Sequence, residues 1–127
     1  MYSSNKMYLK DYSPYPFIID SIKLDFSIET SKVVVSNEMN IKPLSVNPPL
    51  ILNGAGLEID SIAIDEVRLP ENAFSLSENC LKIFKPPLKQ FKLRIVNTIN
   101  PFNNSALEGL YLSEGILITQ CEAEGFR

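Results

Sequence analysis

Three polar side chains near the end of the chain have types and a spacing that suit the binding of a cation. Gln120, Glu122 and Glu124 follow the apolar residues 116–118 and lie two residues apart. In an extended chain, residues at this spacing point to the same face. Two carboxylates and an amide beside an apolar strand lower stability unless water or a cation offsets them. An ammonium group suits this face, because it brings three donors and a positive charge.

The same three residues also fit a simpler interpretation. A strand that ends in water carries carboxylates without any function, because charged side chains are usually solvated. Spacing alone leaves both interpretations open, and the solvated strand end is the more ordinary of the two.

Other kinds of chemistry are excluded by what the chain lacks. It has no histidine, which rules out a Ser-His-Asp or Cys-His nucleophile pair within these residues. The commonest zinc ligand is therefore absent too. The sequence also has no glycine-rich phosphate loop and no calcium loop. We predict no catalytic residue and no metal ligand within this chain.

The remaining candidate ligands have structural interpretations. Cys80 and Cys121 lie about forty residues apart inside apolar runs, so we expect reduced, buried thiols rather than a CxxC site or a disulfide scaffold. Asp60, Asp65 and Glu66 have the types to touch a cation. We interpret them as the solvated face of a strand and the turn that follows it.

The elements that must position these side chains are strands, because apolar and polar residues alternate along most of the chain. In the segment 18–28, the apolar residues occupy even positions: Ile18, Ile22, Leu24, Phe26 and Ile28. Polar residues occupy the odd positions from 21 to 29. This period of two predicts a long strand with one face in water and one face against a core. Alternation over 33–41 predicts its hairpin partner.

Further strands are expected between turn signals. Their segments are 50–52, 57–64, 74–76, 80–84, 91–99, 110–112 and 116–121. Asn53-Gly54, 77–79 and 113–115 have the composition of turns. Tyr111 alternates with leucines that we expect to face the core, and is interpreted as structural. About eight or nine short strands without a helical period indicate an all-β fold, a mainly antiparallel sandwich.

The last segment resembles a known family. The sequences LEGLY at 107–111 and TQCEAEGFR at 119–127 look like the N-terminal domain of the aminopeptidase N family. Members are zinc aminopeptidases of the thermolysin-like (gluzincin) class, and the likeness is to the bacterial alanyl-aminopeptidase branch. It extends more loosely to DY at 11–12, LNG at 52–54 and VNTINP at 96–101.

The resemblance implies a fold and residue roles. In that family the N-terminal domain is a saddle-shaped β-sandwich packed against a thermolysin-like catalytic domain, and one of its loops reaches the active site. By motif, Glu122 would bind the free α-amino group of a peptide substrate. Gln120 would line the first-residue pocket near the scissile bond. Glu124, Cys121 and Arg127 would be supporting residues.

The family's catalytic parts are absent from this chain. It has no H-E-x-x-H helix, no Gly-x-Met-Glu-Asn loop and no counterpart of the tyrosine that stabilises the tetrahedral intermediate. The resemblance thus implies zinc as the cofactor of the full-length enzyme, bound outside this chain. Residues 1–127 are expected to form a single β domain, an incomplete N-terminal domain truncated at its C-terminal end.

Composition bounds the partners and the compartment. The net charge of −3 and the lack of a basic cluster among exposed aromatics give no indication of nucleic-acid binding. No segment approaches the roughly 20 apolar residues of a membrane helix. The polar N-terminus lacks an apolar signal-peptide core, so the cytoplasm is the expected compartment.

A second class of function stays open. A stand-alone β-sandwich that binds another protein leaves little trace in a sequence. It predicts that Gln120 and Glu122 are replaceable, whereas the aminopeptidase hypothesis does not.

Overall fold

The computed structural model describes residues 6 and 8–120, and its regular structure is almost entirely antiparallel β. Ten strands in these residues form three sheets, and the only helices within them are 3₁₀ turns: η1 (Leu9–Asp11), η2 (Glu71–Ala73) and η3 (Pro101–Asn103). No helix in this part of the chain is long and apolar enough to cross a membrane. The expected all-β, antiparallel class is confirmed.

The largest sheet has five strands in the order β1-β2-β8-β4-β5. They are β1 (Phe17–Ile28), β2 (Val33–Pro43), β8 (Phe91–Ile99), β4 (Glu58–Ile64) and β5 (Val67–Arg68). The expected hairpin of residues 18–28 with 33–41 is present as β1 and β2. The strand β8 comes from far along the sequence and pairs with β2 on one side and β4 on the other.

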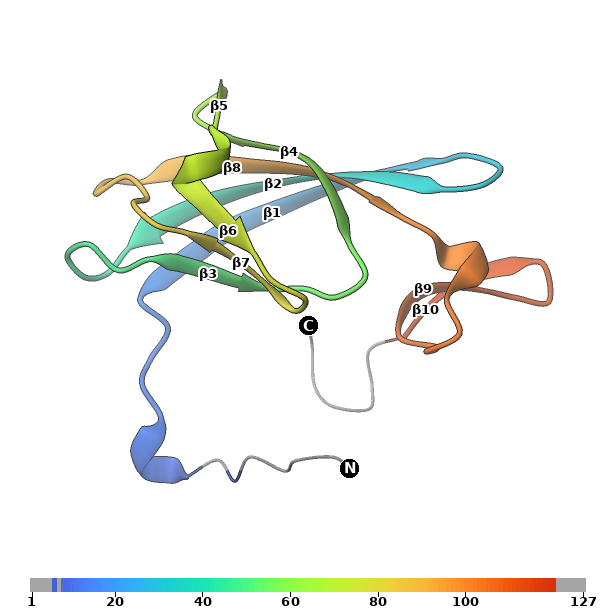
Figure 1. Ribbon diagram of the computed structural model, residues 1–127, viewed down its shortest axis with the longest axis horizontal. Helices are drawn as coiled ribbons and strands as arrows, with labels where there is room; N and C mark the ends of the chain where they lie inside the picture. Colours follow the sequence, from blue (N-terminus) through green and yellow to red (C-terminus); the bar gives the residue numbers. More distant parts are fainter. Residues whose placement is uncertain (1–5, 7, 121–127) are drawn as a thin grey trace.

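A three-stranded sheet, ordered β3-β7-β6, covers part of the large sheet (Figure 1). It consists of β3 (Leu50–Asn53), β7 (Cys80–Ile83) and β6 (Phe74–Leu76). Leu50, Leu81 and Ile83 from this sheet join Met39 and Leu93 of the large sheet in one buried cluster. Burying side chains of this kind contributes about 1.5–3 kcal/mol each, so the contact between the two sheets is the main source of stability.

The alternation predicted for the central strands is confirmed. Along β2 and β8 the buried side chains fall on alternate residues, except that Asn37 in β2 is only half-buried. They are Val33, Val35, Met39, Ile41, Phe91, Leu93, Ile95 and Asn97.

The alternation predicted for β1 is wrong at its start. Ile18 is paired with Lys42 and exposed, whereas its neighbours Phe17 and Ile19 face the core. The cause is a shift of register between Ile19 and Ser21, a β-bulge that adds one residue to the strand. Past the bulge, the even positions lie on the core side of the sheet, as predicted from residue 22 onward. A second shift, between Ile59 and Ser61 in β4, has the same effect there. The prediction that this face of β1 is buried is wrong in the described part of the chain, because Ile22, Leu24, Phe26 and Ile28 are 45–61% exposed.

The last two strands form a separate hairpin, β9 (Gly109–Ser113) with β10 (Ile116–Gln120). A structured connection leads to it from β8. Asn100 Oδ1 accepts hydrogen bonds from the backbone N–H groups of Phe102 and Asn103, at 3.1 and 3.3 Å, and so caps η3. Asn104 Nδ2 then donates to the carbonyls of Glu108 and Leu110, at 2.8 and 2.9 Å. These hydrogen bonds stabilise the loop that connects β8 to β9.

Candidate functional site

The hairpin β9–β10 carries the one predicted substrate-binding residue that the structure describes. Its turn is Glu114-Gly115, and both residues have positive φ, at 49° and 81°. This is the geometry of a two-residue turn that matches the twist of the flanking strands. The turn fixes the register, so that Tyr111 lies opposite Ile118 and Gln120 opposite Gly109.

Gln120 is held by a residue of the neighbouring strand. The hydroxyl of Tyr111 donates to Gln120 Oε1 at 3.0 Å. Tyr111 is only 8% exposed, whereas Gln120 is exposed. The buried ring thus presents its hydroxyl to an amide at the surface. This contact fixes the carbonyl end of the amide as the acceptor and limits the rotation of the side chain.

The role of Tyr111 was only partly predicted. It is buried, as expected of a structural residue, but Leu112 is exposed and does not face the core. The contact with Gln120 follows from the register: Tyr111 lies opposite Ile118, so Gln120, two residues on, is its diagonal neighbour on the same face. Counting outward from the two-residue turn at Glu114-Gly115 is the signal that would have found it.

The other predicted site residues, Cys121, Glu122, Glu124 and Arg127, lie outside the described residues.

Three carboxylates considered as cation ligands are engaged in local structure. Asp60 Oδ2 accepts from the hydroxyl of Thr98 at 2.8 Å, and Asp65 Oδ1 accepts from the backbone N–H of Lys92 at 2.9 Å. Glu66 forms an ion pair with Arg94 at 2.8 Å. Within residues 6 and 8–120, no group of three or more His, Cys, Asp or Glu side chains is placed to hold a metal ion. These contacts fit the interpretation of Asp60, Asp65 and Glu66 as structural residues of a strand and its turn.

A small network of charges lies on the outer face of the large sheet. Glu38 interacts with Lys92 at 3.5 Å and with Arg94 at 3.3 Å. Desolvation raises the pKa of Glu38, but the hydrogen bond from Arg94 and the charge of Lys92 outweigh it and hold that pKa below its ordinary value of 4.5. The group thus remains ionised, and we interpret it as a cross-strand stabiliser.

Cys80 is a free thiol and half-buried, less enclosed than expected. Its Sγ lies 3.1 Å from Ser77 Oγ, and its backbone N–H donates to the same hydroxyl at 3.2 Å. These contacts close the turn between β6 and β7, so Cys80 has a structural role.

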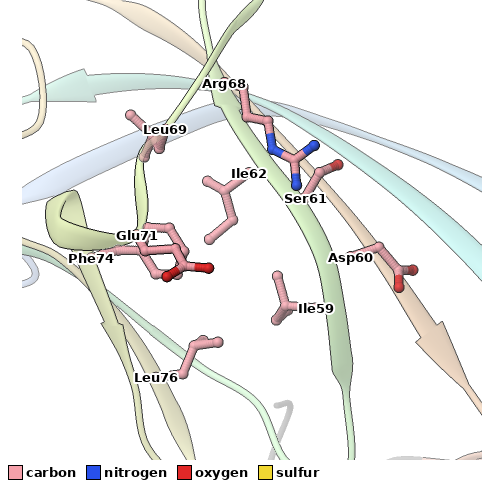
Figure 2. A pocket seen from close by; sticks show the side chains of 9 residues that line it. All are labelled: Ile59, Asp60, Ser61, Ile62, Arg68, Leu69, Glu71, Phe74 and Leu76. Carbon is pink, nitrogen blue, oxygen red and sulfur yellow. The ribbon is translucent and has the colours of Figure 1, made fainter.

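An open cavity of about 390 Å³ lies where the two sheets part, between β4 and the η2–β6 segment (Figure 2). Its lining is Ile59, Asp60, Ser61, Ile62, Arg68, Leu69, Glu71, Phe74 and Leu76. Arg68 and Glu71 stand apart on its rim, and the carboxylate of Asp60 is bonded to Thr98. The cavity is the open side of the core and shows no set of groups arranged for catalysis.

Comparison with known proteins finds aminopeptidase N relatives. The chain is 41% identical over 120 residues to aminopeptidase N of Caulobacter vibrioides, and 40% identical over 121 residues to aminopeptidase N of Escherichia coli. Each match covers 94% of this chain. The chain is homologous to the N-terminal region of aminopeptidase N. It spans 14% of the length of these aminopeptidase N relatives. No protein-family model matches it.

Solved structures agree with the aminopeptidase N homology. Aminopeptidase A of Legionella pneumophila, crystallised with aspartic acid, superposes with a TM-score of 0.78 at 26% identity. That match covers 92% of this chain and 14% of the Legionella protein. An M1 zinc metallopeptidase of Deinococcus radiodurans, bound to a Tyr-Ser-Ala substrate, gives 0.67 at 11% identity over 84% of this chain and 27% of its own. The second likeness concerns the fold alone.

Proposed function

We propose that this chain is the N-terminal β domain of a zinc aminopeptidase that removes single N-terminal residues from peptides, and that it contributes recognition of the substrate's α-amino group. The observation that carries the proposal is the 41% identity to aminopeptidase N over 94% of the chain. Because the match ends within the first part of that protein, catalysis itself would be performed by polypeptide outside these residues.

Glu122 is the proposed ligand of the α-ammonium group. An exopeptidase must distinguish a charged N-terminus from an internal peptide bond. A carboxylate in a partly dry cleft attracts an ammonium far more strongly than one in water. It also penalises an N-blocked peptide, which would leave the carboxylate desolvated and unpaired.

Gln120 is the proposed amide of the first-residue pocket. Support comes from its position at the end of a two-stranded hairpin and from the buried Tyr111, whose hydroxyl holds Gln120 Oε1 at 3.0 Å. A binding group that is already oriented loses less entropy when the substrate arrives. Glu124 and Cys121 act as supporting residues beside these two and make no proposed contact with substrate.

The proposed cofactor, zinc, has no fitting ligand set among the described residues, and the whole chain lacks histidine. The metal would be held elsewhere in a longer polypeptide, where it would polarise the scissile carbonyl and activate water. The proposed partners are peptides with a free N-terminus and a thermolysin-like catalytic domain against which this domain packs. The proposed compartment is the cytoplasm.

The coding sequence beyond the codon for Arg127 tests this proposal. We expect an in-frame continuation with an H-E-x-x-H motif and a later glutamate ligand. A stop codon at that point would contradict the proposal and favour a stand-alone protein-binding module.

A further inference from the structure

The side chain of Asn104 bonds to three backbone groups of the loop that leads into β9. Its Oδ1 accepts from the backbone N–H of Ala106 at 3.1 Å, and its Nδ2 donates to the carbonyls of Glu108 and Leu110 at 2.8 and 2.9 Å. The backbone therefore uses both donors of this amide and one of the two acceptor positions on its oxygen. A single half-buried side chain thus ties together the segment 106–110.

The segment that Asn104 holds contains backbone of unusual conformation. Leu107 has a φ of 58° and Gly109 a φ of 67°. The left-handed region is unfavourable for a leucine, whereas a glycine adopts it freely. A residue of this kind keeps its conformation only where the surrounding contacts determine it. Two of the Asn104 hydrogen bonds reach the residues on either side of Leu107, and these contacts supply that constraint.

The hydrogen bonds of Asn104 end beside the contacts that β9 makes with Gln120. The two carbonyls that accept from Asn104 belong to the residues before and after Gly109. Gly109 lies opposite Gln120 in the hairpin. Tyr111, two residues further on, donates to Gln120 Oε1 at 3.0 Å. A displacement of this part of β9 would therefore move both of these neighbours of Gln120 at once.

The backbone that carries Asn104 is itself anchored. The turn η3 packs against β9 and lies beside the hairpin in Figure 1. Its first residue, Pro101, is fully buried, and Asn100 caps it by accepting from two backbone N–H groups. Asn104 follows directly after η3. A side chain mounted on fixed backbone can hold a neighbouring strand in place, as the supporting residues of binding sites do.

We propose that Asn104 is a positioning residue for substrate binding, which holds β9 where Gly109 and Tyr111 orient the amide of Gln120. The inference rests on the proposed role of Gln120 in the first-residue pocket. Asn104 makes no proposed contact with substrate. It acts by keeping the amide oriented before the substrate arrives, which reduces the entropy lost on binding. Loss of Asn104 should therefore raise KM more than it lowers kcat.

Steady-state kinetics of a chimera test the proposal. The 127 residues replace the matching segment of the Caulobacter aminopeptidase N, and the substrate is an aminoacyl p-nitroanilide with a free amino group. Asn104→Ala removes all three hydrogen bonds, whereas the nearly isosteric Asn104→Asp keeps the acceptor and removes both donors. We expect each variant to lower kcat/KM about three- to tenfold, mainly through KM.

The matched control is Asn103→Ala. Asn103 is the exposed neighbour of Asn104, and its side chain makes no hydrogen bond within the described residues. This substitution should leave kcat/KM unchanged. A normal kcat/KM in both Asn104 variants, together with a reduced value in Gln120→Ala, would overturn the positioning role and leave the proposed function standing.

A double-mutant cycle separates positioning from a merely structural role. If Asn104 acts through Gln120, Asn104→Ala should have little further effect on kcat/KM in a Gln120→Ala background. A general loss of folded enzyme would instead lower kcat/KM by the same factor in both backgrounds, and that result would refute the proposal. An unchanged kcat/KM in Gln120→Ala alone would overturn the proposed role of Gln120, and this inference with it.

Discussion

The contact between Tyr111 and Gln120 can be measured through the stability of the chain. Tyr111→Phe removes the hydroxyl that donates to Gln120 Oε1 at 3.0 Å and leaves the buried ring in place. A hydrogen bond between neutral groups contributes about 0.5–1.5 kcal/mol net. Because the Gln120 side chain is exposed, water can replace the lost donor. We therefore expect the free energy of unfolding to fall by about 0.5–1 kcal/mol, the lower part of that range.

A double-mutant cycle isolates this bond from other effects. The second variant is Gln120→Met, which removes the acceptor and keeps the length of the side chain. If the bond forms as described, the two substitutions together should cost less than the sum of their separate costs, with a coupling energy of about 0.5 kcal/mol. Urea unfolding followed by far-ultraviolet circular dichroism suits the measurement, because the chain has no tryptophan.

The matched control is Tyr12→Phe. Tyr12 is 75% exposed and makes no hydrogen bond through its hydroxyl in the described residues, so its substitution should leave stability unchanged. Strictly additive costs for the Tyr111 and Gln120 variants would refute the reasoning that Tyr111 orients the amide.

Two further predictions concern the body of the domain. Leu93→Ala empties a site with no exposed surface at the centre of the core and should lower the free energy of unfolding by about 2–5 kcal/mol; the same change at the exposed Leu88 should have little effect, and equal costs in urea unfolding would contradict the assigned core. Glu38→Gln should lower stability at neutral pH. Because the pKa of Glu38 is lowered in the folded state, its contribution is present above the unfolded value of 4.5 and is lost as pH falls through the folded value. The stability difference between the two proteins should therefore vanish in acid, and a difference that does not change with pH would contradict the ion-pair network.

The sequence predicted the strands well where side-chain burial follows a simple period. The alternate residues of β2 and β8 are buried as predicted because both strands are paired on each side and one face packs on the second sheet. The bulge between Ile19 and Ser21 was not predictable, because the insertion of a residue depends on pairing with β2 and leaves no local signature. The two-residue strand β5 is too short for a period to be seen.

For the candidate site, the sequence predicted Gln120 as a binding residue, and the structure adds its hydrogen bond with Tyr111. A strand at 116–121 and a turn at 113–115 were predicted from apolar periodicity and turn composition, and the structure has β10 (Ile116–Gln120) after a turn at Glu114-Gly115. The bond to Tyr111 depends on hairpin register and was missed. The role of Glu122 rests on family likeness, because a carboxylate's function is set by the cleft around it, which distant polypeptide builds.

The substitution Glu122→Gln tests the central claim most directly. A chimera would carry these 127 residues in place of the matching segment of the Caulobacter aminopeptidase N, and kcat/KM would be measured on an aminoacyl p-nitroanilide with a free amino group. Loss of a charge-assisted contact should reduce kcat/KM by the equivalent of about 1.5–3 kcal/mol. Arg127→Lys, at a supporting residue that keeps its charge, serves as the control and should change it little. An unchanged kcat/KM in the Glu122→Gln chimera would contradict the claim that this chain recognises the substrate's α-amino group.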